Sequence, residues 1–147
     1  MLVEPDCVFC SILSEKQPGK VIFRERISSC ILDTSPVFKG HSLIIPSSHY
    51  AHLSDMPDSV LSDMQKCAKI LSAAMEESLG CDGTLMIMNN KVSQSVPHVH
   101  MHVIPRRFGD HLRGFLWPRV RYSSEDEAES IVSTLAKAYE RHSRGKG

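Results

Sequence analysis

Three histidines alternate with apolar residues in the segment 97–105, which a proline closes at each end, and this segment constrains the fold more than any other. Side chains along a β-strand point alternately to its two faces, so the pattern predicts a strand with His98, His100 and His102 together on one exposed face. The outer two histidines would stand about 13 Å apart, at a rise of about 3.3 Å per residue. One metal ion, with nitrogen bonds of about 2.0–2.1 Å, could hold two neighbours but not all three.

At least one of these histidines must therefore have a role other than metal binding. Imidazoles titrate near neutral pH, and a row of them suits phosphate binding, nucleophilic attack and proton transfer. The alternative is a set of half-exposed strand histidines without a function. That alternative suits a single histidine better than three in strict alternation.

The cysteines indicate a possible metal site near the N-terminus. Cys7 and Cys10 form a Cys-x2-Cys pair, which is half of a tetrahedral zinc site and needs two further ligands. The alternative is a reduced pair of core thiols that binds no metal. Cys30, Cys67 and Cys81 lack paired spacing and are predicted to be buried thiols.

Hydrophobic periodicity and turn signals predict an α+β domain on an antiparallel sheet, because strands close in sequence usually pair and helices are inserted between them. Gly80 is placed to cap the helix that follows Pro57, and residues 124–127 read as a capping box that opens a last helix. The predicted helices begin near residues 7, 57 and 125, and the predicted strands lie at 21–23, 29–33, 41–45, 84–89 and 97–105.

Composition and length are those of one soluble domain spanning residues 1–147. Seventeen basic and seventeen acidic side chains cancel, so no net charge favours nucleic acid or an anionic membrane as a partner. Glu4 and Asp6 argue against a secretory or mitochondrial leader, and no apolar run approaches the length of a membrane span. Five cysteines without a leader predict a reducing compartment. We therefore expect a cytoplasmic protein, with the nucleus as a second location.

The histidine pattern resembles that of the histidine-triad (HIT) family of nucleotide hydrolases and transferases. Further segments follow in the order and at about the spacing of that family, and together they cover residues 7–107. These segments are Cys7-Val8-Phe9-Cys10, Ile31-Leu32-Asp33-Thr34-Ser35-Pro36, Gly40-His41-Ser42-Leu43-Ile44-Ile45-Pro46, His49 and Gln94-Ser95-Val96. The resemblance implies a HIT-like fold, which is a five-stranded antiparallel sheet with two main helices and usually forms a homodimer. Residues 108–147 would be a C-terminal loop and helix.

The resemblance also implies a catalytic apparatus. His100 matches the family nucleophile, which attacks the α-phosphate and forms a nucleotidyl-histidine intermediate. His102 and His41 match the histidines around the phosphate, where each could act as a cation or as a neutral N–H donor. Ser95 matches the serine that donates to the leaving group. His41 could instead be a strand-end residue bonded to the backbone.

Substrate contacts are implied in the same way. Asp33 matches the carboxylate that binds both ribose hydroxyls, although it could instead cap the turn at 35–36. Phe9 and Ile31 would be apolar walls for a purine ring. Gln94 would contact the phosphate chain. Asn89 and Asn90 match the asparagine that the family carries at the end of the preceding strand, and either of the two could face the site.

Family members with the Cys-x2-Cys pair, like the related galactose-1-phosphate uridylyltransferases, bind zinc through the two cysteines and two histidines. Those histidines match His49 and His98 here. Such a zinc ion would be structural, with all four positions filled by Cys7, Cys10, His49 and His98, and would anchor the N-terminal helix to the sheet. No catalytic cofactor is implied.

Two regions depart from the family pattern. The loop 89–94 lacks the glycines that many relatives carry, which predicts a stiffer backbone, and Lys91 offers a charge there instead. Residues 108–119 form an aromatic and basic segment, in which Trp117 would contact the site or pin a surface loop.

The leading hypothesis is therefore a hydrolase or nucleotidyl transferase that acts on purine nucleoside phosphoramidates or related adenylates. A hydrolase of dinucleoside polyphosphates is an alternative within the same chemistry. A second class is a nucleotide-binding adaptor with little catalysis. A third is a zinc hydrolase, which would require a metal ligand at His100.

Overall fold

The computed structural model of the chain describes residues 2–112 and 122–144. The chain divides into two compact units, residues 1–110 and 111–147. The first unit carries all the predicted catalytic and metal-binding residues, and the second carries helix α4 (Glu125–Arg144). The prediction of one domain over residues 1–147 stays a prediction. Among the described residues, no helix is both long enough and apolar enough to cross a membrane.

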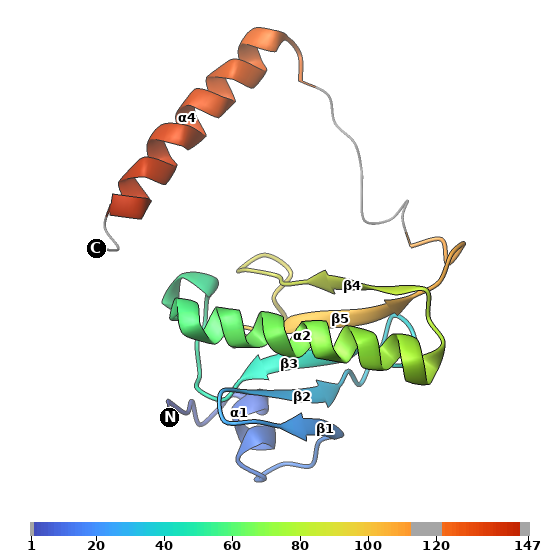
Figure 1. The fold of residues 1–147 in the computed structure, drawn as a ribbon. Coiled ribbons are helices and arrows are strands. Elements are labelled where there is room, and N and C mark those ends of the chain that lie inside the picture. Colours follow the sequence, from blue (N-terminus) through green and yellow to red (C-terminus); the bar gives the residue numbers. More distant parts are fainter. Residues whose placement is uncertain (1, 113–121, 145–147) are drawn as a thin grey trace. The chain divides into compact units, whose positions relative to one another are not determined.

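The first unit is built on a five-stranded sheet in which every neighbouring pair is antiparallel, as predicted (Figure 1). The strands follow the order β1-β2-β3-β5-β4, so β1 and β4 are the edges. Their bounds are β1 (Val21–Arg24), β2 (Ser28–Leu32), β3 (Ser42–Pro46), β4 (Gly83–Ile87) and β5 (Met101–Arg106). The fold class predicted from the sequence is confirmed.

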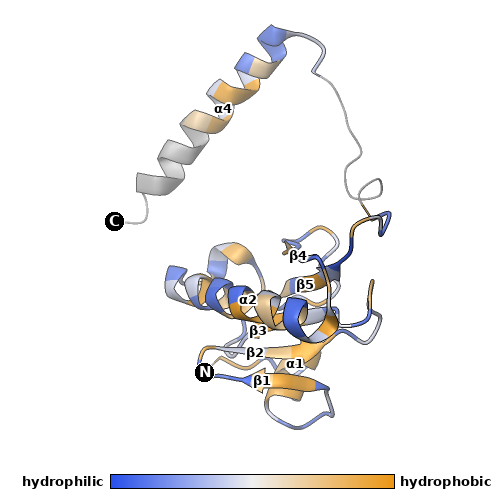
Figure 2. Cartoon of the chain, turned by 45° about the vertical axis from the view of Figure 1, so that its right-hand side comes forward, coloured by the Kyte–Doolittle hydropathy of each residue, from blue (hydrophilic) through white to orange (hydrophobic). Residues whose placement is uncertain are grey.

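Helix α2 (Asp58–Leu79) covers one face of this sheet (Figure 1). Its stripe of Met64, Ala68, Leu71 and Met75 is buried and forms one core cluster with sheet residues that include Val103. Gly80 ends the helix in the left-handed conformation at φ 60°, which confirms the predicted cap. Figure 2 shows the same division, with apolar residues concentrated in the strands and polar residues on the outer side of α2.

Helix α1 (Val8–Leu13) belongs to a second core cluster, which contains alternate residues of the central strands. Ile31 of β2, with Leu43 and Ile45 of β3, packs with Phe9 and Ile12 there, whereas their neighbours in the two strands pack with α2. The short helix η1 (Leu53–Asp55) precedes α2. The sheet therefore has a helix on each face and a small hydrophobic core under each helix. The predicted histidine row lies beside the core that contains α1.

The strand predicted over residues 97–105 is shorter than expected and begins at Met101. The pairing of β5 with β3 ends at the pair Ile44 and Met101. Two residues further along β3 is Pro46, which has no N–H to donate to a continued ladder. The Pro46 carbonyl instead accepts from the His98 ring at 3.1 Å. His98 and His100 therefore lie in an irregular segment just before the strand, and only His102 lies within it.

The predicted capping box of α4 is formed in part. The hydroxyl of Ser124 accepts a hydrogen bond from the Glu127 N–H at 3.1 Å, as predicted. The Glu127 carboxylate, however, accepts from the backbone N–H and hydroxyl of Ser123, not from the N–H of Ser124. The helix start is therefore stabilised by two serines rather than one.

Candidate active site and metal centre

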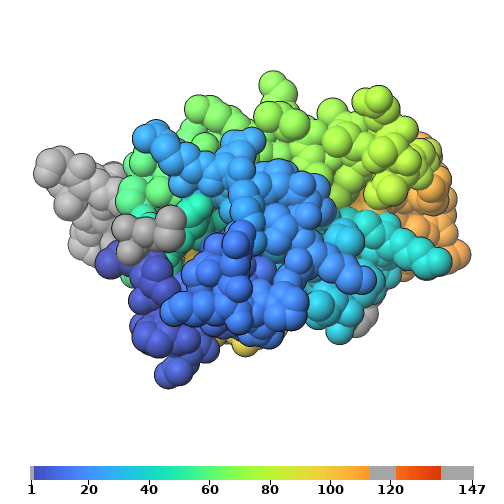
Figure 3. Space-filling view, turned by 90° about the horizontal axis from the view of Figure 1, so that it is seen from below, coloured from blue at the N-terminus to red at the C-terminus, as the bar shows by residue number. Residues whose placement is uncertain are grey.

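A cavity of about 340 Å³ opens beside the histidine row. It lies between α1, the segment that follows α1, the end of β2 and the segment that leads into β5. Six of the predicted site residues line it, namely Phe9, Ile31, Asp33, Ser95, His100 and His102. Figure 3 views the molecule from below and shows the N-terminal region, coloured blue, spread over this side. The fold thus brings together residues that are up to 93 positions apart in the chain, from Phe9 to His102.

His100 does not stand on an exposed face as the alternation predicts, because it is only 2% exposed. Helix α1 covers the row, and the ring of Phe9 meets the His100 ring edge-on at a centroid distance of 5.1 Å. The His100 ring nevertheless borders the cavity. The His100 ring is therefore buried in the protein but open to the cavity.

The hydrogen bond of His100 fixes its tautomer. Its Nδ1 lies 2.7 Å from the His98 carbonyl oxygen. A carbonyl can only accept, so Nδ1 carries the proton and donates it. In the neutral ring the lone pair is then on Nε2, which is the nitrogen that must be free for nucleophilic attack.

His41 and His102 form the second part of the site. Two consecutive hydrogen bonds, from Val37 to His41 and from His41 to His102, fix which ring nitrogens carry a proton. The Val37 N–H donates to Nδ1 of His41 at 3.2 Å, so this nitrogen carries no proton. Nε2 of His41 then carries the proton and donates to Nδ1 of His102 at 2.8 Å. Neutral His102 consequently has its proton on Nε2. His41 is bonded to the backbone, as one of the two predicted alternatives requires, and it also contacts the triad.

Burial keeps both of these rings neutral. Burial, with smaller contributions from the neighbouring His100 and His41, lowers the pKa of His102 to about 4, although the charge of Asp33 opposes this shift. Burial also lowers the pKa of His41, although the Asp33 carboxylate opposes this shift. The sequence left open whether these histidines act as cations or as neutral donors. These pKa shifts favour neutral donors at pH 7.

Asp33 caps the turn, as one of the two predicted alternatives requires, and it also borders the cavity. One carboxylate oxygen accepts the Ser35 N–H at 2.7 Å and so caps the turn. The other lies 3.6 Å from Nε2 of His41, and the residue also lines the cavity. Turn capping therefore leaves one oxygen of Asp33 facing the site.

The structure does not bring the three polar residues of the β4–β5 loop to the cavity. Gln94 donates from its amide to the Ala51 carbonyl and accepts the Lys91 N–H, both at 2.8 Å. Asn89 donates to the Ser93 carbonyl, and Asn90 accepts the Leu53 N–H, each at 3.1 Å. These side chains hold the loop in shape. Trp117, which was predicted to contact the site or to pin a surface loop, lies outside the described residues.

Sequence reasoning missed the segment that follows α1. Gln17, Lys20 and Thr34 also line the cavity and add polar groups to its wall. Pro18-Gly19 indicated a turn here, but a turn signal does not say which cavity the turn will border. Gly19 lies so close to α1 that a Cβ would stand 2.4 Å from Ile12, so the segment is held tightly against the helix.

The predicted zinc ligands lie close together at the His98 end of the histidine row. One donor atom from each of Cys7, Cys10, His49 and His98 lies within 4.8 Å of the others. Nδ1 of His98 is 3.4 Å from the Cys7 sulfur and 3.7 Å from the Cys10 sulfur, and Nδ1 of His49 is 3.5 Å from the Cys10 sulfur. Tetrahedral zinc, with bonds of about 2.3 Å to sulfur and 2.0–2.1 Å to nitrogen, places sulfur and nitrogen ligands about 3.6 Å apart. The donor set therefore fits zinc.

Hydrogen bonding prepares His98 for this position. Its Nε2 donates to the Pro46 carbonyl, so Nδ1 is the unprotonated nitrogen and faces the two sulfurs. Burial, together with the nearby His49, lowers the pKa of His98 to about 4, so the ring is neutral near pH 7.

A second group of possible metal donors consists of Asp33, His41 and His102, which also lie within 4.8 Å of one another. Both ring nitrogens of His41 are already hydrogen-bonded, to Val37 and His102, so a metal would have to displace one bond. His100 belongs to neither group of donors among the described residues. The geometry therefore does not support the zinc-hydrolase alternative, which needs a metal ligand at His100.

A five-stranded antiparallel sheet with a row of three histidine rings beside one cavity defines a histidine-triad protein. The family model described as "HIT domain" matches residues 14–109, and the chain belongs to this family.

Two similar relatives are hydrolases by name. The chain is 38% identical over 142 residues to adenylylsulfatase HINT3 from Arabidopsis thaliana, covering 92% of the chain and 70% of the relative. It is 39% identical over 116 residues to adenosine 5′-monophosphoramidase HNT1 from Saccharomyces cerevisiae, covering 76% and 70%. These findings support a nucleotide hydrolase at the level of the family.

A solved structure supports the same conclusion about the fold. A zinc-bound histidine triad family protein from Mycobacterium smegmatis matches with a TM-score of 0.70 and 32% identity. The match covers 92% of the chain and 97% of the solved chain. The family model itself begins after Cys10, so it does not bear on the cysteine pair.

Proposed function

We propose that this protein hydrolyses purine nucleoside phosphoramidates or related adenylates through a nucleotidyl intermediate on His100. The observation that carries the proposal is the bond from Nδ1 of His100 to the His98 carbonyl, because it puts the lone pair on Nε2 of a ring that borders the cavity. A nitrogen nucleophile divides one difficult displacement into two easier ones.

The proposed reaction has two steps. In the first, Nε2 of His100 forms a bond to the α-phosphorus while the bond from phosphorus to the leaving group breaks. The Ser95 hydroxyl, which lines the same cavity, donates a hydrogen bond to the leaving group, and the leaving amine takes its proton from solvent water. In the second step, water attacks phosphorus, the phosphorus–nitrogen bond breaks, and the proton of the attacking water is released to solvent. A transferase would differ only in using another acceptor in place of water.

The other lining residues have supporting roles in this proposal. His102, neutral with its proton on Nε2, would donate to a non-bridging phosphate oxygen as negative charge develops. The free oxygen of Asp33 would accept ribose hydroxyls. The purine ring would lie against Phe9 and Ile31 in the apolar part of the cavity.

The test is mass spectrometry of protein quenched during turnover of adenosine 5′-phosphoramidate. We expect nucleotide mass on the peptide that contains His100. We also expect His100→Ala to lose turnover while it still binds the nucleotide, and the exposed His111→Ala to behave as the wild type. Normal hydrolysis by His100→Ala would show that the mechanism is wrong.

The relatives suggest two leaving groups for comparison, because one is named an adenylylsulfatase and the other an adenosine 5′-monophosphoramidase. A substrate panel should contain adenylylsulfate, adenosine 5′-phosphoramidate and a dinucleoside tetraphosphate. The largest kcat/KM would identify the preferred class. Nucleotide binding without turnover of any of them would favour the adaptor alternative.

We also propose that Cys7, Cys10, His49 and His98 hold a structural zinc ion, which would supply a rigid link between α1 and the histidine segment. The geometry of the donors supports this assignment. Zinc content measured by atomic absorption should be one ion per chain in the wild type and in Cys81→Ser, and should fall in Cys7→Ser. Equal zinc content in Cys7→Ser and in the wild type would remove Cys7 from the site.

A homodimer is proposed on the family resemblance. Strand β4 is an edge strand of the described sheet and exposes Met86 (44%), so it offers an unpaired row of backbone groups to a second copy. Sedimentation equilibrium of the full chain tests this state. A cytoplasmic location, with the nucleus as an alternative, and the absence of a nucleic-acid partner stay predictions.

A further inference from the structure

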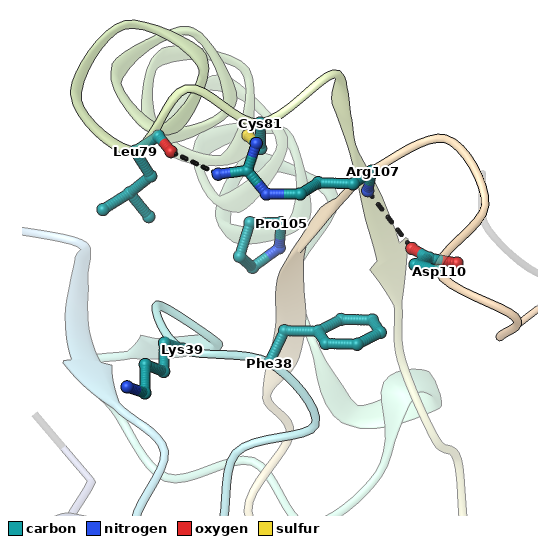
Figure 4. A pocket seen from close by; sticks show the side chains of 7 residues that line it. All are labelled: Phe38, Lys39, Leu79, Cys81, Pro105, Arg107 and Asp110. Atoms are coloured by element: carbon teal, nitrogen blue, oxygen red, sulfur yellow. Dashed lines mark hydrogen bonds between the residues drawn. The ribbon is translucent and has the colours of Figure 1, made fainter.

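A second cavity, of about 360 Å³, lies at the end of α2 (Figure 4). It shares no lining residue with the cavity beside His100. Its walls come from the loop before β3, the end of α2 and the end of β5. The lining consists of Phe38, Lys39, Leu79, Cys81, Pro105, Arg107 and Asp110. The proposed reaction uses none of these residues.

The walls of this cavity combine flat apolar surface with positive charge. Phe38, Leu79 and Pro105 give the apolar part (Figure 4). Lys39 is exposed and forms no ion pair with any residue that the structure describes. The guanidinium of Arg107 donates to the carbonyls of Leu79 and Gly80, which uses two of its five N–H groups.

The negative charges nearby are already engaged. The Asp110 carboxylate pairs with Arg106 and accepts the Arg107 N–H, and Asp82 accepts the Phe108 N–H. Lys39, Arg106 and Arg107 thus contribute three positive charges against two negative ones. The excess positive charge is at Lys39, which lines the cavity and whose side chain extends away from Arg107 in Figure 4, so it favours an anion at the edge of the cavity.

We propose that this cavity binds a small organic anion with a flat, apolar body. The body would lie against Phe38, Leu79 and Pro105, and the carboxylate or sulfonate would contact Lys39 and the free N–H groups of Arg107. A volume of about 360 Å³ suits a ligand of this size.

The cavity is connected to the catalytic residues by the loop that forms its wall. The Phe38 carbonyl accepts the His41 N–H at 2.9 Å, and the neighbouring Val37 N–H donates to the His41 ring at 3.2 Å. A ligand that contacts Phe38 and Lys39 therefore touches the segment that sets the tautomer of His41. Occupation of the cavity is expected to disturb the His41 ring.

Calorimetric titration of the full protein with 2-naphthoate tests the binding site. We expect binding by the wild type and by His100→Ala, so the result does not depend on the proposed reaction. Lys39→Glu should weaken binding at least tenfold and Lys39→Gln by less, while Lys69→Glu on the exposed face of α2 should leave it unchanged. Equal affinity of Lys39→Glu and the wild type, or displacement of 2-naphthoate by AMP, would overturn the proposal.

The connection to His41 has a readout of its own. Ring nitrogen shifts of the histidines, recorded by NMR with and without saturating 2-naphthoate, should move for His41 in the wild type. In Lys39→Glu at the same ligand concentration they should not move. Unchanged His41 shifts in the saturated wild type would refute the connection.

Discussion

The burial of His102 predicts a specific loss of stability in acid. The ring is held neutral, with a pKa of about 4 in the folded protein, against a value of about 6.5 for an unfolded chain. Between these values the unfolded chain binds the proton more readily, so acid favours unfolding. Stability is therefore full above pH 6.5, falls as the pH is lowered, and levels off near pH 4.

The size of this effect follows from the two pKa values. Lowering the pH from 7 to 5 should cost the folded state about 2 kcal/mol through His102, since the unfolded ring is almost fully charged at pH 5 and the folded ring is mostly neutral. His102→Asn removes the titrating group. The Asn side-chain oxygen can still accept the proton of His41, which Nδ1 of His102 accepts at 2.8 Å.

The assay is urea unfolding followed by circular dichroism at pH 7 and at pH 5, with equal zinc in every sample. The wild type should lose about 2 kcal/mol more than His102→Asn between the two pH values. Acid-sensitive groups that do not contact His102 are common to both proteins and cancel in the difference, whereas His41 and His100, which interact with His102, contribute to it. His111→Asn, which removes an exposed imidazole, should lose as much as the wild type. An equal loss in His102→Asn and the wild type would refute the reasoning.

Three further stability predictions use the same urea assay. Gly40→Ala should cost about 1–3 kcal/mol, because φ is +101° and the new Cβ would stand 2.5 Å from Leu79, whereas Gly83→Ala, with open space around it, should cost little. Phe9→Ala should cost about 3–5 kcal/mol, since the ring is buried against His98 and His100. Ser93→Gly should stabilise by up to about 1 kcal/mol, because it relieves a left-handed φ of 59°. Changes of opposite sign would contradict each argument.

The periodicity of the chain was enough to predict an α+β domain on an antiparallel sheet, and the family resemblance added the five-stranded HIT-like form. Apolar residues that repeat at three and four positions predicted α2, and apolar runs between turn signals predicted the five strands. Such elements bury one face, and this leaves a regular pattern in the sequence. The length of the histidine strand could not be predicted in this way. It depends on Pro46 in β3, which is about 55 residues away and meets the segment only after folding.

The alternation of histidine with apolar residues predicted correctly that the His100 and His102 side chains lie on one face. It did not predict how little of that face is exposed. The His100 and His102 rings do lie next to each other, at a centroid distance of 5.0 Å. Phe9 of α1 helps to bury His100, and His41 packs against His102. A polar residue at every second position gives no indication that other elements will cover it. The same limit applies to the β4–β5 loop, where Gln94 turns to Ala51 instead of the cavity. Asn and Gln in a loop have many possible partners, and sequence does not choose among them.

The three histidines of the row differ in which ring nitrogen carries the proton, because each has a different hydrogen-bond partner at one nitrogen. His98 donates from Nε2 to Pro46, which leaves Nδ1 for a metal, and His100 donates from Nδ1 to His98, which leaves Nε2 for the cavity. His102 accepts at Nδ1 from His41, so its proton remains on Nε2. One repeated residue type thus presents three different arrangements of its ring nitrogens, which suit the metal ligand, the nucleophile and the proton donor that we propose. Because backbone groups fix all three tautomers directly or through His41, replacing Val37 by proline, which removes its N–H, should disturb His102 while leaving the tautomer of His100 unchanged.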